Sequence, residues 1–166
     1  MKNAWITGLL WFSAVGCGVM AGVYFAFSVF VMTALSRIDQ ASGVAAMNSI
    51  NTVILRSLFM PLFFGTTVAA LILAAVALLR WGAPGAPAML VGGAAYVLGM
   101  FVVTMLLNVP LNSALQAAEP SIADAATTWG RYLREWTMWN HIRTVASTAA
   151  CALFIFALAA RIGTDR

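Results

Sequence analysis

The sequence has few of the side chains on which common catalytic and metal sites are built. Its 166 residues include one histidine, two cysteines and five acidic residues. Cys17 and Cys151 stand alone within apolar runs, and the chain has no CxxC motif. Because metal sites need several such ligands close together, the sequence predicts no metal centre and no cofactor. A haem held by His141 as its single axial ligand is an alternative that the residues leave open.

Charge is scarce as well. Charged residues make up 8% of the chain, hydrophobic residues make up 63%, and the mean hydropathy is +0.93. This composition excludes an ordinary soluble globule and indicates a polytopic membrane protein. The net charge is +4, but the nine basic residues are scattered singly, so no nucleic-acid partner is expected. The expected partners are the lipid bilayer and a hydrophobic small molecule, and a homo-oligomer is also compatible with the sequence.

Four apolar stretches are long enough to cross the roughly 30 Å hydrocarbon core as helices. They cover residues 5–35, 58–79, 88–107 and 140–160. An amphipathic helix is expected over 122–138, and the spacing of Ser121 and Asp124 matches a capping box at its start. The predicted fold class is all-α: a single transmembrane domain over residues 1–166, an integral membrane four-helix bundle with an extramembrane amphipathic helix leading into the fourth transmembrane helix.

Two local features refine this prediction. Pro110 lies between Asn108 and Asn112, which predicts that the third helix kinks or ends near Asn108, because proline lacks a helical donor. Small residues recur every fourth position in the first helix, which predicts a close approach by a neighbouring helix; they are Ala14, Gly18, Gly22 and Ala26.

An even number of crossings places both termini and the loop after the second helix on one side of the membrane. The basic residues of that side crowd into short tails and one tight turn, and they are Lys2, Arg80, Arg161 and Arg166. The positive-inside rule responds to such short segments. We therefore expect a multi-pass protein of the cell inner (plasma) membrane with both termini in the cytoplasm.

Residues 129–144, WGRYLREWTMWNHIRT, form the densest polar and aromatic segment. A helical period places one set on a common face: Trp129, Leu133, Trp136, Asn140 and Arg143. The opposite face carries Arg131, Arg134, Glu135 and Met138. The first face takes Asn140 and Arg143 into an apolar run, where buried polar groups need partners.

Topology brings further polar side chains to the same end of the bundle: Asn48, Asn51, Arg56, Asn108, Asn112 and His141. Amides and arginines with few carboxylates predict a donor-rich pocket suited to an anionic or phenolic oxygen rather than to a cation. Two other interpretations stay open. Asn108, Asn112, Asn140 and Arg143 would also serve as an interhelical hydrogen-bond network without a ligand. Arg56 would also serve as a residue that snorkels to the membrane interface.

Several of these segments occur in an order that is similar to the anthrone oxygenase family of four-helix membrane proteins. They are Tyr-Phe-Ala-Phe-Ser at 24–28, Ala-Ala-Met-Asn-Ser-Ile-Asn at 45–51, Asn-Val-Pro-Leu-Asn at 108–112, Trp136, and Trp-Asn-His-Ile-Arg-Thr at 139–144. The resemblance covers about residues 22–158. Fungal members oxidise anthrones to anthraquinones with oxygen and no added cofactor, whereas most bacterial relatives have no assigned reaction. The resemblance implies a membrane-embedded, cofactor-independent oxygenase-like protein, a monooxygenase acting on a hydrophobic aromatic molecule of anthrone or quinone type.

The same resemblance implies roles for individual residues. His141 would be the base, since histidine titrates near neutrality, and Arg143 with Arg56 would stabilise an oxyanion. Hydrogen bonds to the substrate would come from Asn51, Asn108, Asn112 and Asn140, and a flat substrate would lie against Trp136, Trp139 and Tyr24. His141 lies about 100° around the helix from Asn140, so both cannot face one site, and Asn140 is the one expected to point inward.

The alternative function is a non-enzymatic membrane protein that binds a hydrophobic ligand or partner. A transporter or channel is disfavoured, because no mid-membrane charge marks a path.

Overall fold

The computed structural model describes residues 4–118 and 122–163, with side chains from residue 127 onward in the second range. The described chain consists of helices and short connections, without strands. In chain order the helices are α1 (Ala4–Ala26), the π-helix η1 (Phe27–Val31), α2 (Met32–Leu35), α3 (Gln40–Ile54), α4 (Phe59–Leu79), α5 (Ala86–Tyr96), the π-helices η2 (Val97–Val102) and η3 (Thr104–Asn108), α6 (Val109–Ala118) and α7 (Ile122–Gly163).

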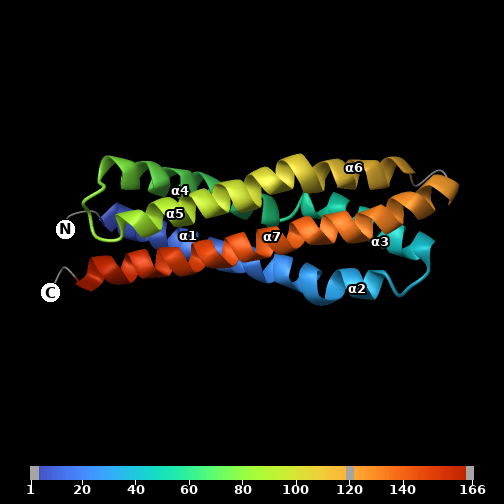
Figure 1. Cartoon of the computed structure of the whole chain (residues 1–166), viewed down its shortest axis with the longest axis horizontal. Helices are drawn as coiled ribbons and strands as arrows, with labels where there is room; N and C mark the ends of the chain where they lie inside the picture. The colour runs from blue at the N-terminus through green and yellow to red at the C-terminus, as the bar shows by residue number, and fades with distance from the viewer. Residues whose placement is uncertain (1–3, 119–121, 164–166) are drawn as a thin grey trace.

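Within residues 4–118 and 122–163, four continuous helical rods are long and apolar enough to span a membrane: Ala4–Leu35, Phe59–Leu79, Ala86–Ala118 and Thr127–Gly163. Figure 1 shows them lying along one long axis, with the start of α1, the end of α7 and the α4–α5 connection at one end and α3 at the other. The predicted all-α bundle with four apolar helices is confirmed. The cytoplasmic placement of the end that holds the termini stays a prediction.

The third rod differs from the sequence prediction. It does not end near Asn108 but continues through Pro110 to Ala118. The π-helices η2 and η3 lie before the proline, and η3 ends two residues ahead of it at Asn108. A π-helical turn widens the helix, which relieves the clash between a proline ring and the carbonyl four residues earlier.

Two other segments are more helical than expected. Residues 40–54, which lie between the first two predicted spanning helices, form the 15-residue helix α3. The carboxylate of Asp39 caps it by accepting a hydrogen bond from the Ser42 backbone N–H at 2.9 Å. Hydrogen bonds from the Ser42 side chain and then from its backbone lower the pKa of Asp39. The expected amphipathic helix and fourth transmembrane helix are one 42-residue helix, α7. The predicted capping box involves Ser121 and the side chain of Asp124, which lie outside the described residues.

Helix backbones approach one another closely in the half of the bundle that holds the termini. A Cβ on Gly93 of α5 would lie 2.7 Å from the Ala70 carbonyl oxygen of α4, so these backbones are in close contact. The small-residue ridge predicted in α1 is only partly correct. Ala14 is buried and a Cβ on Gly18 would lie 3.5 Å from Cys151 Sγ, but a Cβ on Gly22 would meet nothing within 4 Å.

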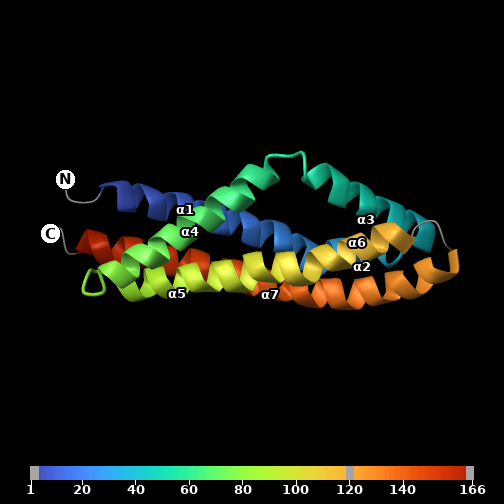
Figure 2. The ribbon, with the colours of Figure 1, turned by 90° about the horizontal axis from the view of Figure 1, so that it is seen from above.

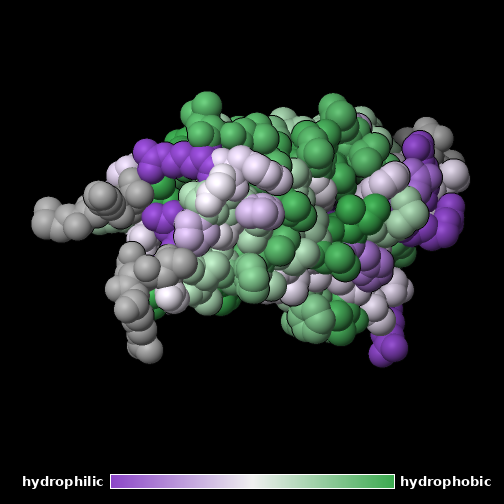
Figure 3. Space-filling view, turned by 60° about the vertical axis from the view of Figure 1, so that its left-hand side comes forward, coloured by the Kyte–Doolittle hydropathy of each residue, from purple (hydrophilic) through white to green (hydrophobic). Residues whose placement is uncertain are grey.

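The outside of the spanning helices is apolar. Figure 3 shows hydrophobic residues over the middle of one face and hydrophilic residues gathered toward its two ends. This distribution is the one expected of helices whose outer faces contact lipid. Figure 2 shows α3 and α4 rising away from the other helices toward the connection between them, which covers residues 55–58. The site described next lies beneath this connection.

Candidate ligand-binding site

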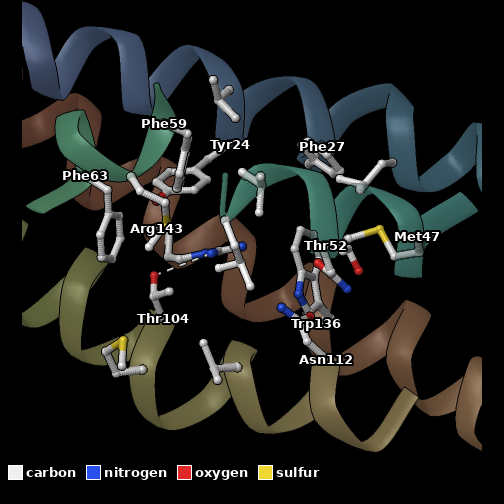
Figure 4. A pocket seen from close by; sticks show the side chains of 18 of the residues that line it. Tyr24, Phe27, Met47, Thr52, Phe59, Phe63, Thr104, Asn112, Trp136 and Arg143 are labelled. Atoms are coloured by element: carbon white, nitrogen blue, oxygen red, sulfur yellow. Dashed lines mark hydrogen bonds between the residues drawn. The ribbon is translucent and has the colours of Figure 1, made fainter. Parts of the chain in front are cut away.

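A cavity of about 500 Å³ lies between α1, η1, α3, α4, the rod η3–α6 and α7 (Figure 4). Its walls are mainly aliphatic and aromatic. The polar side chains and those with a polar tip are Tyr24, Asn48, Asn51, Thr52, Thr104, Asn112, Ser113, Gln116, Trp136 and Arg143. An apolar concave site with a few converging polar groups is typical of small-molecule binding, and its volume lies within the roughly 300 to 1,000 Å³ of such sites.

Arg143 is the charged residue of the cavity. Its side chain is only 5% exposed. One terminal nitrogen, Nη2, donates to Asn140 Oδ1 at 2.7 Å, and the other, Nη1, donates to Thr104 Oγ1 at 3.4 Å. The guanidinium carbon lies 4.4 Å from the ring centre of Tyr24 and 4.9 Å from that of Trp136. Neutral dipoles and aromatic faces therefore hold this cation.

No carboxylate pairs with Arg143 among the side chains that the structure describes. The ion pair found there joins Arg131 and Glu135 at 2.9 Å, on the exposed side of α7. A buried guanidinium without a counter-ion carries a desolvation cost that neutral hydrogen bonds offset only in part. A ligand oxygen with negative charge would complete its coordination.

Asn140 orients the arginine. Its Nδ2 donates to the Tyr24 backbone carbonyl and to Ser28 Oγ, both at 2.7 Å, while its Oδ1 accepts from Arg143. Asn140 is fully buried and does not line the cavity. Its hydrogen bonds tie α7 to α1 and η1, so it positions Arg143 rather than contacting a ligand.

The π-helical segments adjoin this network. η1 carries Phe27 and Ser28, and η3 carries Thr104 and Asn108. Such segments shift side chains out of the regular helical register and are frequent at functional sites. Here they bring the Ser28 and Thr104 hydroxyls within hydrogen-bond distance of Asn140 and Arg143.

A second polar group lies toward the α3 end of the cavity. The Tyr132 hydroxyl donates to Asn112 Oδ1 at 2.8 Å, and Asn108 Nδ2 donates to the Trp136 carbonyl at 3.1 Å. The rings of Trp129, Tyr132 and Trp136 stack in sequence, with centres 5.8 and 5.7 Å apart. These contacts fix α7 against η3 and α6, as the interhelical-network interpretation expects.

The structure brings together some of the residues singled out from the sequence. Those that line the cavity are Tyr24, Asn48, Asn51, Asn112, Trp136 and Arg143. Asn108 and Asn140 are buried behind the wall and bond to residues that line it. Trp139 is half-buried and packs against the aromatic stack outside the cavity.

The expected base and the expected second arginine are not at the cavity. His141 is exposed on α7, and Arg56 is exposed in the α3–α4 connection. With Asn140 and Arg143 pointing inward, the helical period turns His141 outward. The helix therefore does not turn His141 toward the site, as its expected role as a base would require.

Several residues of the site were missed, among them Tyr132 and Thr104. Tyr132 lies three residues after Trp129 and four before Trp136, so the helical period of the inward face was a sufficient signal. Thr104 lies within an apolar run, and nothing in the sequence marks it as the partner of an arginine 39 residues later.

The chemistry of the cavity follows from these groups. It offers a cation and several hydrogen-bond donors, while none of its described lining residues is a histidine or a carboxylate. Within the described residues, no three His, Cys, Asp or Glu side chains come together as a metal site would require. The arrangement is suited to stabilising an anionic oxygen on a largely apolar molecule.

Comparison with known proteins gives one match. The family model described as anthrone oxygenase matches residues 54–153, which is more than half of the chain. The matched range runs from the end of α3 into α7 and includes Thr104, Asn140 and Arg143, but not Tyr24 or Asn51. No curated protein and no solved structure gives a significant match.

Proposed function

This chain belongs to the anthrone oxygenase family, and we propose that it is a membrane-embedded oxygenase-like enzyme. Its substrate is a flat, hydrophobic aromatic molecule of anthrone or quinone type, and the reaction needs no added cofactor. The observation that carries the proposal is Arg143, a buried guanidinium without a described carboxylate partner, in the wall of a largely apolar cavity of about 500 Å³.

The proposed reaction uses the acidity of an anthrone. Loss of a proton from the ring carbon opposite the carbonyl gives an aromatic enolate, whose charge lies largely on oxygen. Electrons pass from this anion to dioxygen, and a C–O bond forms at that carbon. The resulting peroxide anion takes up a proton from water and becomes a hydroperoxide. The hydroperoxide loses water as its O–O bond breaks and the carbon gives up its second hydrogen. One oxygen atom thus ends in the new quinone carbonyl and the other in water.

Arg143 contributes by stabilising the enolate oxygen. A cation held in a low-dielectric site interacts with a developing negative charge more strongly than it would in water. Because Asn140 and Thr104 fix the guanidinium in place, little reorganisation is needed when the anion forms. In the absence of a described lining base, the proton passes to water or hydroxide, and His141 has no part in the proposed step.

The apolar walls hold the substrate. Phe59, Phe63 and Trp136 present aromatic surface to the cavity, and flat aromatic molecules pack well against such rings. In Figure 4, Phe59 and Phe63 lie on one side of the Arg143 side chain and Trp136 lies on the other. The walls also limit the access of water to the anion.

The test follows anthrone absorbance and oxygen uptake with purified, chelator-treated protein. We expect oxidation faster than the spontaneous rate, with one dioxygen consumed per anthrone. Arg143→Met should lose the acceleration, whereas Arg134→Met, a change at an exposed arginine of the same helix, should keep it. Oxidation no faster than without protein would contradict the proposal.

The second candidate is a non-enzymatic protein that binds a hydrophobic ligand, with the polar cluster serving as an interhelical network. The lack of a described lining base and the bonds that Asn140 makes to α1 and η1 favour it. It predicts saturable binding of an aromatic phenol with no oxygen uptake.

A further inference from the structure

Along the axis of the bundle the cavity lies between two buried apolar clusters. The cluster toward α3 includes Met32, Val44 and Leu115. The cluster toward the termini includes Tyr96 and Met100, and Phe63 of this cluster also lines the cavity.

The cavity is open at its side, between α4 and the rod η3–α6. Four apolar residues both line the cavity and are substantially exposed: Leu55 (63%), Phe64 (46%), Met105 (43%) and Val109 (39%). We refer to these four as the mouth. Phe64 belongs to the second spanning helix and Met105 and Val109 belong to the third. Figure 2 shows α4 leaving the α5–α6 rod as it approaches the α3–α4 connection, which is where the mouth lies.

The wall changes character along the third rod. Met105 and Val109 are followed, at helical spacing, by Ser113 and Gln116, which also line the cavity and are exposed. Eleven residues of helix correspond to about 16 Å, so the opening passes from apolar to polar over about that distance along the rod. Such an opening suits a molecule that is mostly apolar and carries a polar oxygen.

We propose that the ligand enters the cavity sideways from the bilayer, through the mouth between α4 and the rod η3–α6. The occupant is a flat aromatic molecule dissolved in the membrane that carries an ionisable oxygen, which pairs with Arg143. A lipid acyl chain fits the apolar walls but offers no partner to the guanidinium. This inference rests on the ligand class of the proposed function, and it does not require that oxidation takes place.

The route is tested by the binding kinetics of 1,8-dihydroxyanthraquinone, an already oxidised probe, followed by its visible absorbance in vesicles containing the protein. The double variant Met105→Phe/Val109→Phe narrows the mouth. The matched control Leu98→Phe/Leu106→Phe adds the same rings to exposed positions of the same rod that do not line the cavity.

Narrowing the mouth should slow association and dissociation alike, each on the order of tenfold, with little change in the dissociation constant. The control pair should bind at the wild-type rates. In addition, raising the lipid content tenfold at fixed total probe and protein should slow association, because the probe is diluted within the bilayer. Equal rates for the two double variants, or association that ignores the lipid content, would overturn the lateral route.

Failure of this route and failure of the proposed function are distinguishable. If anthrone oxidation fails while the probe still enters through the mouth, the proposed enzymatic activity is contradicted and the lateral route is retained. If a lipid chain occupies the cavity, the probe shows no saturable binding at any lipid content. That result would overturn the inference.

Discussion

The two halves of the bundle are built on different principles. Near the termini, α1, α4, α5 and α7 pack a continuous apolar core, and backbones touch where glycine allows it, as at Gly93 and Ala70. Around Arg143, α1, α3, α4, the rod η3–α6 and α7 enclose a cavity of about 500 Å³. Amides and a cation are buried there, and the first and third rods contain π-helical turns. Cavities and buried unpaired charge both cost stability. The difference indicates that the half near the termini supplies most of the folding stability. The half around Arg143 is less stable because its side chains are arranged for ligand chemistry.

The largest effect expected from this comparison is at Arg143. Arg143→Met should weaken binding of an ionised phenolic ligand on the order of 100-fold, the size of effect seen when one oxyanion donor is removed. Thermal stability should stay the same or rise, because the variant no longer buries a guanidinium without a described counter-ion. Ligand titration and thermal melting of the same samples would check both parts.

The interhelical-network interpretation predicts the opposite pattern for this variant. If the hydrogen bonds from Arg143 to Asn140 and Thr104 mainly lock the helices, Arg143→Met melts at a clearly lower temperature. A large loss of stability with unchanged ligand affinity would therefore contradict the account in which one half supplies stability and the half around Arg143 binds a ligand.

A smaller effect is expected in the tightly packed half. A Cβ on Gly93 would press on backbone atoms of α4, so Gly93→Ala should destabilise the protein by about 1 to 3 kcal/mol. Gly22→Ala is the matched control in α1, where a Cβ meets open space. It should be neutral or stabilising by up to about 1 kcal/mol, since alanine is the better helix former. Equal melting temperatures for the two variants would contradict the packing account.

The smallest effect concerns the cap of α3, the helix that forms one wall of the cavity. The hydrogen bonds from the Ser42 side chain and backbone lower the pKa of Asp39 in the folded protein. Their contribution is therefore present above the unfolded pKa of about 3.9 and is lost as pH falls through the lower folded value. Asp39→Asn should keep the cap and remove this pH dependence, whereas Asp39→Ala should lose the cap at every pH. Hydrogen exchange of the α3 amides measures the difference.

The fold was largely predictable because spanning helices are set by the length and apolarity of the sequence. The expected second helix, 58–79, agrees within one residue with α4, and the expected first helix, 5–35, agrees with the first rod. The end of the third helix was not predictable, because the helix accommodates Pro110 through π-helical turns that have no sequence signature.

The site was predictable only in part. The helical period of α7 correctly placed Trp136, Asn140 and Arg143 on the buried face. The same period turned His141 outward, although its chemistry had suggested a base. The cavity itself depends on the way α3 and α4 bend away from the other helices, which is a tertiary feature. Thr104 therefore became a site residue only through packing.

The most direct measurement of the central claim is the ionisation of a bound ligand. In bilayers containing the wild-type protein, the absorbance of bound 1,8-dihydroxyanthraquinone should show its phenol ionising at a lower pH than in the same bilayers without protein, because a neighbouring cation favours the anion. Arg143→Met should remove this shift. An ionisation midpoint that is unchanged or raised on binding to the wild-type protein would contradict the assignment of Arg143 as the group that stabilises a ligand oxyanion.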